Sequence, residues 1–356
     1  MVQIAPAKLE DVATAILVAA GSAELEAREV ARHLVGANLK GHDSHGVSML
    51  VEYVTNVQAG FLHPNRHARI VTEFGAIAVF DGDMGYGQIT AREATEWGIA
   101  KAKSEGLAAV ALRNTHHIAR VGTYGELAAA AGLISLYFVN VLLPPGRVAP
   151  YGGIQGRFGT DPVCITYPSL AGEPPIVLDF ATSKVAAGKI RVAFNAGKQL
   201  DAGTLIDKNG EESRDPGLMY GPDRGAASIL PFGEHKGSGL ALVTHLLAGA
   251  LTGGGVLHEG APYAGIKNGL FSIFIDPKRF GDPEEMERNR ALLIDWVKSA
   301  TPRPGFDEVQ LAGEPERKSE AARAQRIPVD EGTWKTILKA AALAGLDPNA
   351  MELKIK

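Results

Sequence analysis

The sequence is poor in cysteine. Its 356 residues include only Cys164, so no disulfide bond can form within the chain. A lone thiol is typical of proteins in a reducing compartment, and we therefore expect a cytoplasmic protein. Cys164 lies in the apolar stretch 162–167, where a buried and unreactive thiol is favoured over a catalytic one.

Other absences exclude whole classes of protein. No run of 18 apolar residues occurs, and residues 1–6 lack the basic and apolar regions of a signal peptide. The formal net charge is −4, so the chain as a whole lacks the excess of positive charge that is typical of nucleic-acid-binding proteins. We therefore expect no membrane span and no nucleic-acid partner. With 46% hydrophobic and 21% charged residues, the composition suits a globular protein long enough for two domains.

The familiar nucleotide-binding motifs are also missing. No Gly-x-x-x-x-Gly-Lys-[Ser/Thr] sequence occurs, and after Gly237-Ser238-Gly239 the third glycine of a dinucleotide fingerprint is replaced by Leu242. The segment 232–239 still has glycines and Lys236 in front of an apolar helix, 239–251. This pattern is typical of a phosphate cradle at a helix N-terminus, or of a glycine-rich turn with a purely structural role.

Helical segments at both ends enclose a β-rich middle. Residues 8–60 have helical spacing, with Gly41 at a C-terminal cap and Asp43 or Ser44 as candidate caps of a helix over 47–58. Short apolar runs predict strands at 76–80, 107–112, 134–141, 176–178 and 273–275. Helices are predicted at 88–105, 124–131 and 333–344, and a hairpin turn at 207–210. We expect one helical, dimerisation domain formed by residues 1–75 and 285–356, and a mixed-sheet, cofactor-binding domain formed by residues 76–284.

Ser44 and His45 are the first candidates for chemistry. A histidine titrates near neutrality and can give a proton to a carbonyl oxygen, while a neighbouring hydroxyl can hydrogen-bond the same oxygen. The alternative is structural: Ser44 caps the next helix and His45 lies on the surface of its first turn.

Polar residues after two predicted strands are further candidates. His116 and His117 open a loop after the strand 107–112, where ligands commonly bind. No cysteine or carboxylate stands at a short metal-motif spacing from them, so we expect no metal site. Asp179 ends the strand 176–178 and can hold ribose hydroxyls, orient a histidine or cap the next segment of the chain. His245, inside the apolar helix, is expected to be a core residue.

Six motifs occur in a fixed order along the chain. Together they resemble those of the type-2 malate/L-lactate dehydrogenase family, which also includes ureidoglycolate dehydrogenase, sulfolactate dehydrogenase and piperideine-2-carboxylate reductase. They are Gly-His-Asp-Ser-His-Gly (41–46), Asn-Thr-His-His-Ile-Ala-Arg (114–120), Phe-Gly-Thr-Asp-Pro (158–162), Leu-Asp-Phe-Ala-Thr-Ser (178–183), Phe-Gly-Glu-His-Lys-Gly (232–237) and Leu-Ala-Gly-Ala-Leu-Thr-Gly-Gly (247–254). The resemblance covers essentially the whole chain. Residues 44–50 and 311–317 look closest to the hydroxycarboxylate dehydrogenase branch.

The resemblance implies an α+β, sulfolactate dehydrogenase-like fold rather than a Rossmann fold, with a largely antiparallel sheet in the cofactor domain and a homodimer. It implies that His45 is the proton donor, with Ser44 beside it. In ureidoglycolate dehydrogenases the histidine that matches His117 is assigned a catalytic role instead, so acid–base catalysis could be divided between His45 and His117. The residues that match the family's contacts to the nicotinamide cofactor are His117, Ala119, Arg120, Thr160, Asp179, Phe180, Ala181, His235, Lys236, Gly313 and Glu314.

The chain departs from the family at three positions. Met49 stands where many members have the arginine that grips the substrate carboxylate, so we expect Met49 to contact the substrate and the carboxylate to be held otherwise. Lys189 replaces an acid of the cyclic-imine reductases, and Asp161 replaces an asparagine.

The sequence therefore predicts hydride transfer between NAD or NADP and a 2-oxo acid/2-hydroxy acid pair. The alternatives are a cyclic-imine or ureidoglycolate-type oxidoreductase on the same scaffold, and a non-catalytic ligand-binding relative. Arg120, Lys184 and Arg317 are equal candidates for recognising a ribose phosphate.

Overall fold

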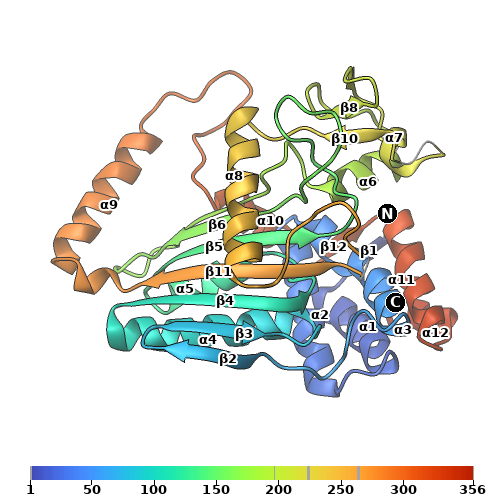
Figure 1. Cartoon of the computed structure of the whole chain (residues 1–356), viewed down its shortest axis with the longest axis horizontal. Coiled ribbons are helices and arrows are strands. Elements are labelled where there is room, and N and C mark those ends of the chain that lie inside the picture. Colours follow the sequence, from blue (N-terminus) through green and yellow to red (C-terminus); the bar gives the residue numbers. More distant parts are fainter. Residues whose placement is uncertain (1, 196, 223–224, 263–264, 356) are drawn as a thin grey trace.

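The structure is a computed structural model that describes residues 2–195, 197–222, 225–262 and 265–355. A seven-stranded sheet forms its centre, and helices pack on the sheet and beside it (Figure 1). The strands are β1 (Val2–Ile4), β2 (Arg69–Phe74), β3 (Ile77–Asp81), β4 (Leu107–His116), β5 (Ile134–Leu142), β6 (Val163–Tyr167), β7 (Ile176–Phe180), β8 (Leu205–Asp207), β9 (Glu212–Ser213), β10 (Ala227–Ile229), β11 (Lys267–Ile275) and β12 (Ile327–Val329). The α-helices are α1 (Pro6–Ala19), α2 (Glu24–Leu39), α3 (Leu50–Gln58), α4 (Gly87–Glu105), α5 (Gly122–Ala130), α6 (Ala187–Asn195), α7 (Gly217–Tyr220), α8 (His235–His245), α9 (Pro283–Lys298), α10 (Glu314–Arg323), α11 (Glu331–Leu343) and α12 (Pro348–Ile355). Shorter helical turns are η1 (Asp43–His45), η2 (Val47–Met49), η3 (Leu246–Leu251) and η4 (Pro277–Arg279).

The central sheet has the strand order β2-β3-β4-β11-β5-β6-β7. Only β3 and β4 pair in parallel among these described strands, and the other neighbours are antiparallel. β11 comes late in the chain yet lies in the middle of the sheet, between β4 and β5. The predicted α+β fold with a largely antiparallel sheet, and without Rossmann topology, is confirmed.

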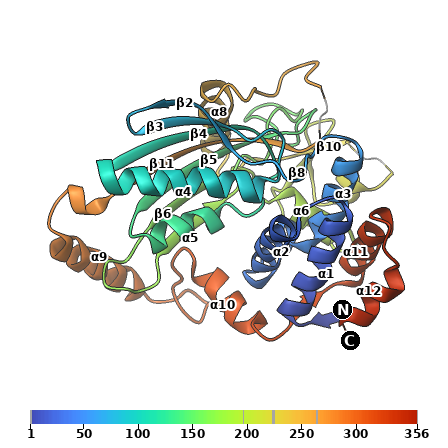
Figure 2. The same ribbon diagram turned by 90° about the horizontal axis from the view of Figure 1, so that it is seen from below.

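The two faces of the sheet are covered differently. α4 and α5 pack along one face (Figure 2), where α4 approaches so closely that a Cβ at Gly98 would lie 2.3 Å from the Phe274 ring. Phe274 and Tyr137 meet edge to face on this side, with ring centroids 5.7 Å apart. α8 crosses the opposite face (Figure 1) and leaves much of it exposed. The main sheet core therefore lies on the α4 and α5 side, where Cys164 is buried as predicted.

The two ends of the chain meet in one helical cluster. β1 and β12 pair antiparallel, with Ile4 opposite Ile327. A single hydrophobic core joins α1, α2 and α3 to α11 and α12 through residues such as Leu9, Leu34 and Ile337. α9 lies away from this cluster, at the far end of the sheet (Figure 1), where Arg290 forms an ion pair with Glu173. The domain boundaries given by the sequence stay a prediction.

A third, smaller unit lies beside the sheet and the helical cluster. β8, β9 and β10 form a three-stranded sheet, and the predicted turn 207–210 joins β8 to β9. The core of this unit contains Val148 and Ile190, together with residues of β8, α7 and β10. α6 therefore belongs to this unit and connects it to the loop that contains Ser44, because α6 packs directly on that loop.

Candidate active site

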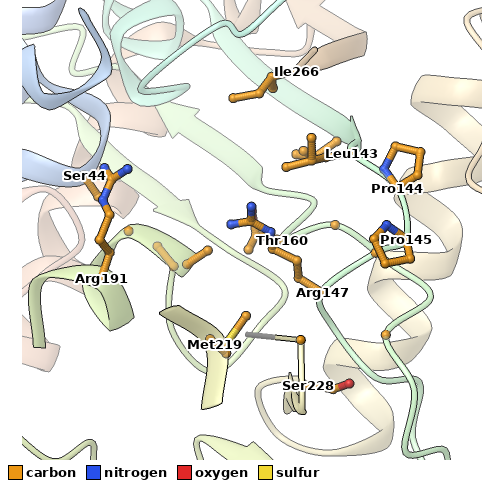
Figure 3. A pocket seen from close by; sticks show the side chains of 18 of the residues that line it. Ser44, Leu143, Pro144, Pro145, Arg147, Thr160, Arg191, Met219, Ser228 and Ile266 are labelled. Carbon is orange, nitrogen blue, oxygen red and sulfur yellow. The ribbon is translucent and has the colours of Figure 1, made fainter. Parts of the chain in front are cut away.

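A cavity of about 690 Å³ lies between the helical cluster, the central sheet and the third unit (Figure 3). Ser44, His45, Met49 and His117 line one part of it. Apolar residues form much of the remaining wall: Val139, Val141, Leu143, Pro144, Pro145, Pro162 and Met219. The volume and the mixture of apolar walls with a few polar groups are typical of a small-molecule site.

The loop 41–46 has a shape that its own sequence enforces. Gly41 has φ +81° directly after α2, as expected of a glycine that ends a helix. Asp43 accepts hydrogen bonds from the Asn38 amide, at 2.6 Å, and from the Arg323 guanidinium, at 2.8 Å. A Cβ at Gly46 would lie 2.1 Å from the Asn38 side chain, so glycine is needed there. These contacts fix the position of His45.

The predicted helix 47–58 and its caps are partly wrong. Two 3₁₀ turns, η1 and η2, come first, and α3 begins only at Leu50, with no side-chain cap. Asp43 is occupied by Asn38 and Arg323, and Ser44 turns to His45 instead of capping a helix. The apolar helix predicted at 239–251 also differs: it begins at His235 and ends in a π-helical turn.

His45 has a hydroxyl on one side and a second imidazole on the other. Ser44 Oγ lies 3.0 Å from His45 Nδ1. The rings of His45 and His117 stack with centroids 5.7 Å apart and an interplanar angle of 21°. Desolvation, followed by repulsion from His42 and Lys189, lowers the pKa of His45 to about 4. His45 is therefore neutral at pH 7 when the cavity holds no anion.

His117 is held by a buried hydrogen-bond chain. Tyr53 Oη lies 2.8 Å from His117 Nδ1 and accepts a hydrogen bond of 2.6 Å from Gln88 Nε2. Burial raises the pKa of Tyr53, so its hydroxyl keeps its proton. The Tyr53 hydroxyl can donate this proton to His117 Nδ1, and in that arrangement the proton of the neutral imidazole lies on Nε2. Burial also lowers the pKa of His117 well below its usual range.

Arg120 belongs to a buried charged layer behind the cavity wall. Its guanidinium pairs with Glu126 at 3.0 Å, while its Nε has no hydrogen-bond partner in the described part of the chain. Asp179 accepts a hydrogen bond of 2.7 Å from the Gly122 amide. Burial raises the pKa of Asp179, and the nearby Arg120 charge opposes that rise.

The cofactor residues suggested by the resemblance fall into two groups. His117, Ala119 and Thr160 line the cavity with Ser44 and His45. The others lie outside its lining, around the end of β7 and the start of α8 and α10: Arg120, Asp179, Phe180, Ala181, His235, Lys236, Gly313 and Glu314.

Thr160 links the two groups. Its carbonyl accepts hydrogen bonds from the Thr182 amide, at 2.9 Å, and hydroxyl, at 3.1 Å. The Phe180 ring meets the Phe232 ring edge to face, with centroids 5.5 Å apart, and so joins the end of β7 to the turn before α8. A Cβ at Gly313 would lie 3.3 Å from Val177 of β7. The second group is therefore one continuous region that begins at the cavity wall.

The remaining histidines are placed as expected or away from the site. His245 is buried, as predicted, with Nδ1 3.2 Å from Asp161 Oδ2, but neither ring nitrogen has a hydrogen-bond partner among the described residues, so the expectation of a satisfied core histidine is only half right. His116 is buried at the end of β4, and burial lowers its pKa to about 3. Within the described ranges, no group of three or more His, Cys, Asp or Glu side chains is arranged to hold a metal ion. None of the helices described is long and apolar enough to cross a membrane.

The sequence did not reveal several groups that shape the site. Tyr53 lies one helical turn after Met49, and that spacing is the only signal that could have indicated it. Arg147, Arg157, Arg191 and Lys208 also line the cavity. They come from four separate segments with no shared motif, so only the tertiary fold brings them together.

Known proteins match this chain over nearly its full length. The malate/L-lactate dehydrogenase family matches residues 4–338. Hydroxycarboxylate dehydrogenase B of Escherichia coli O157:H7 is 43% identical over 93% of this chain and 91% of the relative. A Δ1-pyrroline-2-carboxylate/Δ1-piperideine-2-carboxylate reductase of Pseudomonas putida is 33% identical over 82% of this chain and 85% of the relative. A solved E. coli structure described as a malate/lactate dehydrogenase superposes with a TM-score of 0.93 at 40% identity, over 99% of this chain and 98% of that one. The chain therefore belongs to the malate/L-lactate dehydrogenase family.

Proposed function

We propose that this protein interconverts 2-hydroxy acids and 2-oxo acids with NAD or NADP. The observation that carries the proposal is the stacked pair His45 and His117, with Ser44 on Nδ1 of His45, in the wall of a largely apolar cavity. A reaction at a secondary alcohol needs one group that exchanges the hydroxyl proton and a dry space around the carbon. Family membership supports the same chemistry, since the relatives include a hydroxycarboxylate dehydrogenase.

His45 exchanges the proton in this proposal. Ser44 Oγ can accept the Nδ1 proton of His45; in that tautomer Nε2 of His45 takes the proton of the C2 hydroxyl during oxidation and returns it to the carbonyl oxygen during reduction. A bound nicotinamide would supply the hydride chemistry at C2 in both directions. His117 presents Nε2–H, which can donate a hydrogen bond to the same substrate oxygen. The apolar part of the wall would limit the access of water to C2.

The residues present fit a nicotinamide cofactor. The apolar wall suits a flat ring, and His117, Ala119 and Thr160 would hold that end of the molecule. The region around β7 and α8 would hold the ribose and phosphates through Asp179, Phe180, Ala181, His235, Lys236, Gly313 and Glu314. Two observations support this: the Nε of buried Arg120 lacks a partner among the described residues, and the exposed first turn of α8 carries His235 and Lys236.

The low pKa of His45 predicts opposite pH dependences for the two directions. Oxidation needs neutral His45. Because His45 stays neutral between about pH 8 and about pH 5, its titration should not change kcat/KM for a 2-hydroxy acid in that range. Reduction needs protonated His45, so kcat/KM for the 2-oxo acid should fall about tenfold per pH unit as the pH rises over the same range. Steady-state profiles in both directions test this. An inflection near pH 6.5 in both profiles would contradict a lowered pKa of His45.

A nicotinamide absorbance assay tests the proposed function. The panel contains 2-oxo acids, a cyclic imine carboxylate and ureidoglycolate, each with NAD(H) and NADP(H). We expect turnover of 2-oxo acids. Preferred turnover of the cyclic imine favours the reductase alternative, which the P. putida relative represents in the same family. Cofactor binding without turnover of any compound favours a non-catalytic relative. Comparison of NAD(H) with NADP(H) in the same assay decides the cofactor.

We also propose that the protein is a cytoplasmic homodimer. A second copy would cover large apolar side chains that this chain leaves exposed. Ile165 and Leu178 pair on neighbouring strands of the sheet, and Leu242 and Leu246 lie on α8 and η3. On α9, Trp296 is 77% exposed. Monomeric proteins rarely expose large contiguous apolar patches, and the exposed neighbours Ile165 and Leu178 support a partner subunit over this face of the sheet.

A charged residue on α9 should weaken the dimer. We expect Trp296→Glu to raise the dimer dissociation constant about 10- to 100-fold, because truncating a buried aromatic anchor costs about 2 kcal/mol or more. Sedimentation equilibrium of parent and variant measures the change. Leu25→Glu tests the helical cluster in the same way, since Leu25 is 84% exposed on α2 and the sequence assigns dimerisation to residues 1–75 and 285–356. A parent that is monomeric at all concentrations, or equal dissociation constants, contradicts the proposal.

A further inference from the structure

The structure contains a cation that can replace the arginine missing at position 49. We propose that Arg191, on α6, binds the carboxylate of the substrate and so fixes the substrate class as 2-oxo and 2-hydroxy monocarboxylic acids. This inference rests on the proposed function, and it adds the residue that recognises the acid group.

Arg191 lies next to the proton-exchanging residues. It lines the same cavity as Ser44, His45 and Met49, and its guanidinium points toward Ser44 (Figure 3). The fold produces this proximity through Gly188, one turn earlier in α6. A Cβ at Gly188 would lie 2.2 Å from the Cβ of Ser44, so only glycine allows α6 to pack this closely on the loop.

Arg191 is also free to bind a ligand. In the described part of the chain, no hydrogen bond or ion pair engages its guanidinium, which is half-buried in the cavity wall. By contrast, Arg120 is paired with Glu126, and Arg147 donates to Tyr220 Oη at 3.3 Å. A partly desolvated guanidinium without a partner gains most from a carboxylate, which it can bind through two parallel hydrogen bonds.

The chemistry of the substrate selects Arg191 among the cations of the cavity. In a 2-oxo acid the carboxylate is bonded to the same carbon whose oxygen His45 serves, so its cation must lie beside His45. Arg191 meets this condition, and its charge contributes to the lowered pKa of His45. Arg147 lies across the cavity, toward Thr160 and Pro145 (Figure 3). The side chain of the substrate would then face Met49, where an apolar group is favoured.

The test compares a charged substrate with its neutral amide. Phenylpyruvate and phenylpyruvamide differ only in the group that Arg191 is proposed to bind. We expect Arg191→Met to lower kcat/KM for phenylpyruvate about 10- to 100-fold, mainly through KM, which is the usual effect of losing a charge-assisted contact. The value for phenylpyruvamide and the affinity for the cofactor should change little. Arg191→Lys should restore part of the loss, because it keeps the charge without the planar fork.

Lys189→Met is the matched control. Lys189 is two residues away on α6 and also lowers the pKa of His45, but it is exposed and does not line the cavity. Its removal should leave the acid-to-amide ratio of kcat/KM unchanged.

The outcomes separate the inference from the proposed function. If the parent turns over 2-oxo acids while Arg191→Met keeps the parental acid-to-amide ratio, Arg191 does not bind the carboxylate and only the inference fails. If Lys189→Met changes the ratio as much as Arg191→Met does, the effect is one of general charge and the inference also fails. A parent that turns over no 2-oxo acid overturns the proposed function and the inference together. Where Arg191→Met unfolds at a lower temperature than the parent, the ratio is taken from Arg191→Lys.

Discussion

Replacement of His45 by alanine should lower kcat by about 10²–10⁴-fold, the usual contribution of general acid–base catalysis. Ser44 lies 3.0 Å from His45 Nδ1, and the loop that carries both residues is fixed by Asn38 and Arg323. The substitution therefore removes the proton carrier and leaves its supports in place. Stopped-flow and steady-state rates measure the loss, and cofactor affinity should change little, because the residues proposed to hold the cofactor at this end, His117, Ala119 and Thr160, are unchanged.

His45 can be separated from His117 by comparing their alanine variants. His117 stacks on His45 and is held by Tyr53. If His117 only donates a hydrogen bond, His117→Ala should cost about 5- to 10-fold, the value of one ordinary hydrogen bond. An unchanged kcat in His45→Ala, together with a large loss in His117→Ala, would give the proton transfer to His117. Added imidazole should restore part of the rate only in the variant that has lost the proton carrier.

Met49→Arg should move the substrate preference toward dicarboxylic acids. Met49 lines the cavity beside Ser44 and His45 and cannot pair with a second carboxylate. A guanidinium there would add a charge-assisted contact, which is worth about 1.5–3 kcal/mol. We expect the ratio of kcat/KM for oxaloacetate to that for phenylpyruvate to rise about 10- to 100-fold. Progress curves with both substrates measure the ratio in parent and variant.

Met49→Leu is the control for this experiment, because Met49 also packs in the core of the helical cluster, with 7% of its surface exposed. A volume-conserving swap should leave the ratio unchanged and cost less than about 1.5 kcal/mol of stability. If the parent already prefers oxaloacetate strongly, residue 49 does not determine the preference between monocarboxylic and dicarboxylic substrates as proposed. The thermal unfolding midpoint of Met49→Arg shows whether its side chain is accommodated in the cavity or disturbs the core.

The sequence predicted the local elements better than their assembly. Short apolar runs marked β3, β4, β5 and β7, because alternating or continuous apolar residues are a local signal. No local signal could place β11 between β4 and β5, since pairing at such separation depends on the whole sheet. The same reason applies to the third unit, because Val148 and Ile229 belong to one core although they are far apart in the sequence.

The sequence predicted those parts of the site whose reactive side chains lie within a short motif. Ser44-His45 and His117 follow from their motifs, and the structure brings these segments together in one cavity. Tyr53 and Arg191 were not found, because neither stands in a motif that marks it. From the sequence alone, Tyr53 is indistinguishable from the other residues on the apolar face of its helix. Arg191 is likewise indistinguishable from an ordinary surface cation. Their proposed roles depend on two other residues: Gln88, which is far from Tyr53 in the sequence, and Gly188, which has no side-chain chemistry.

The pairing of β1 with β12 affects how the polypeptide can mature during synthesis. Ile4 pairs with Ile327, so the helical cluster cannot complete this pair of strands until residues 327–329 have left the ribosome. Until then the apolar faces of α1, α2 and α3 lack the partners that α11 provides. The central sheet, whose last strand is β11, can be completed earlier. We expect nascent chains that stop before β12 to depend on chaperones and to aggregate when released, because exposed apolar surface in partly folded chains drives association.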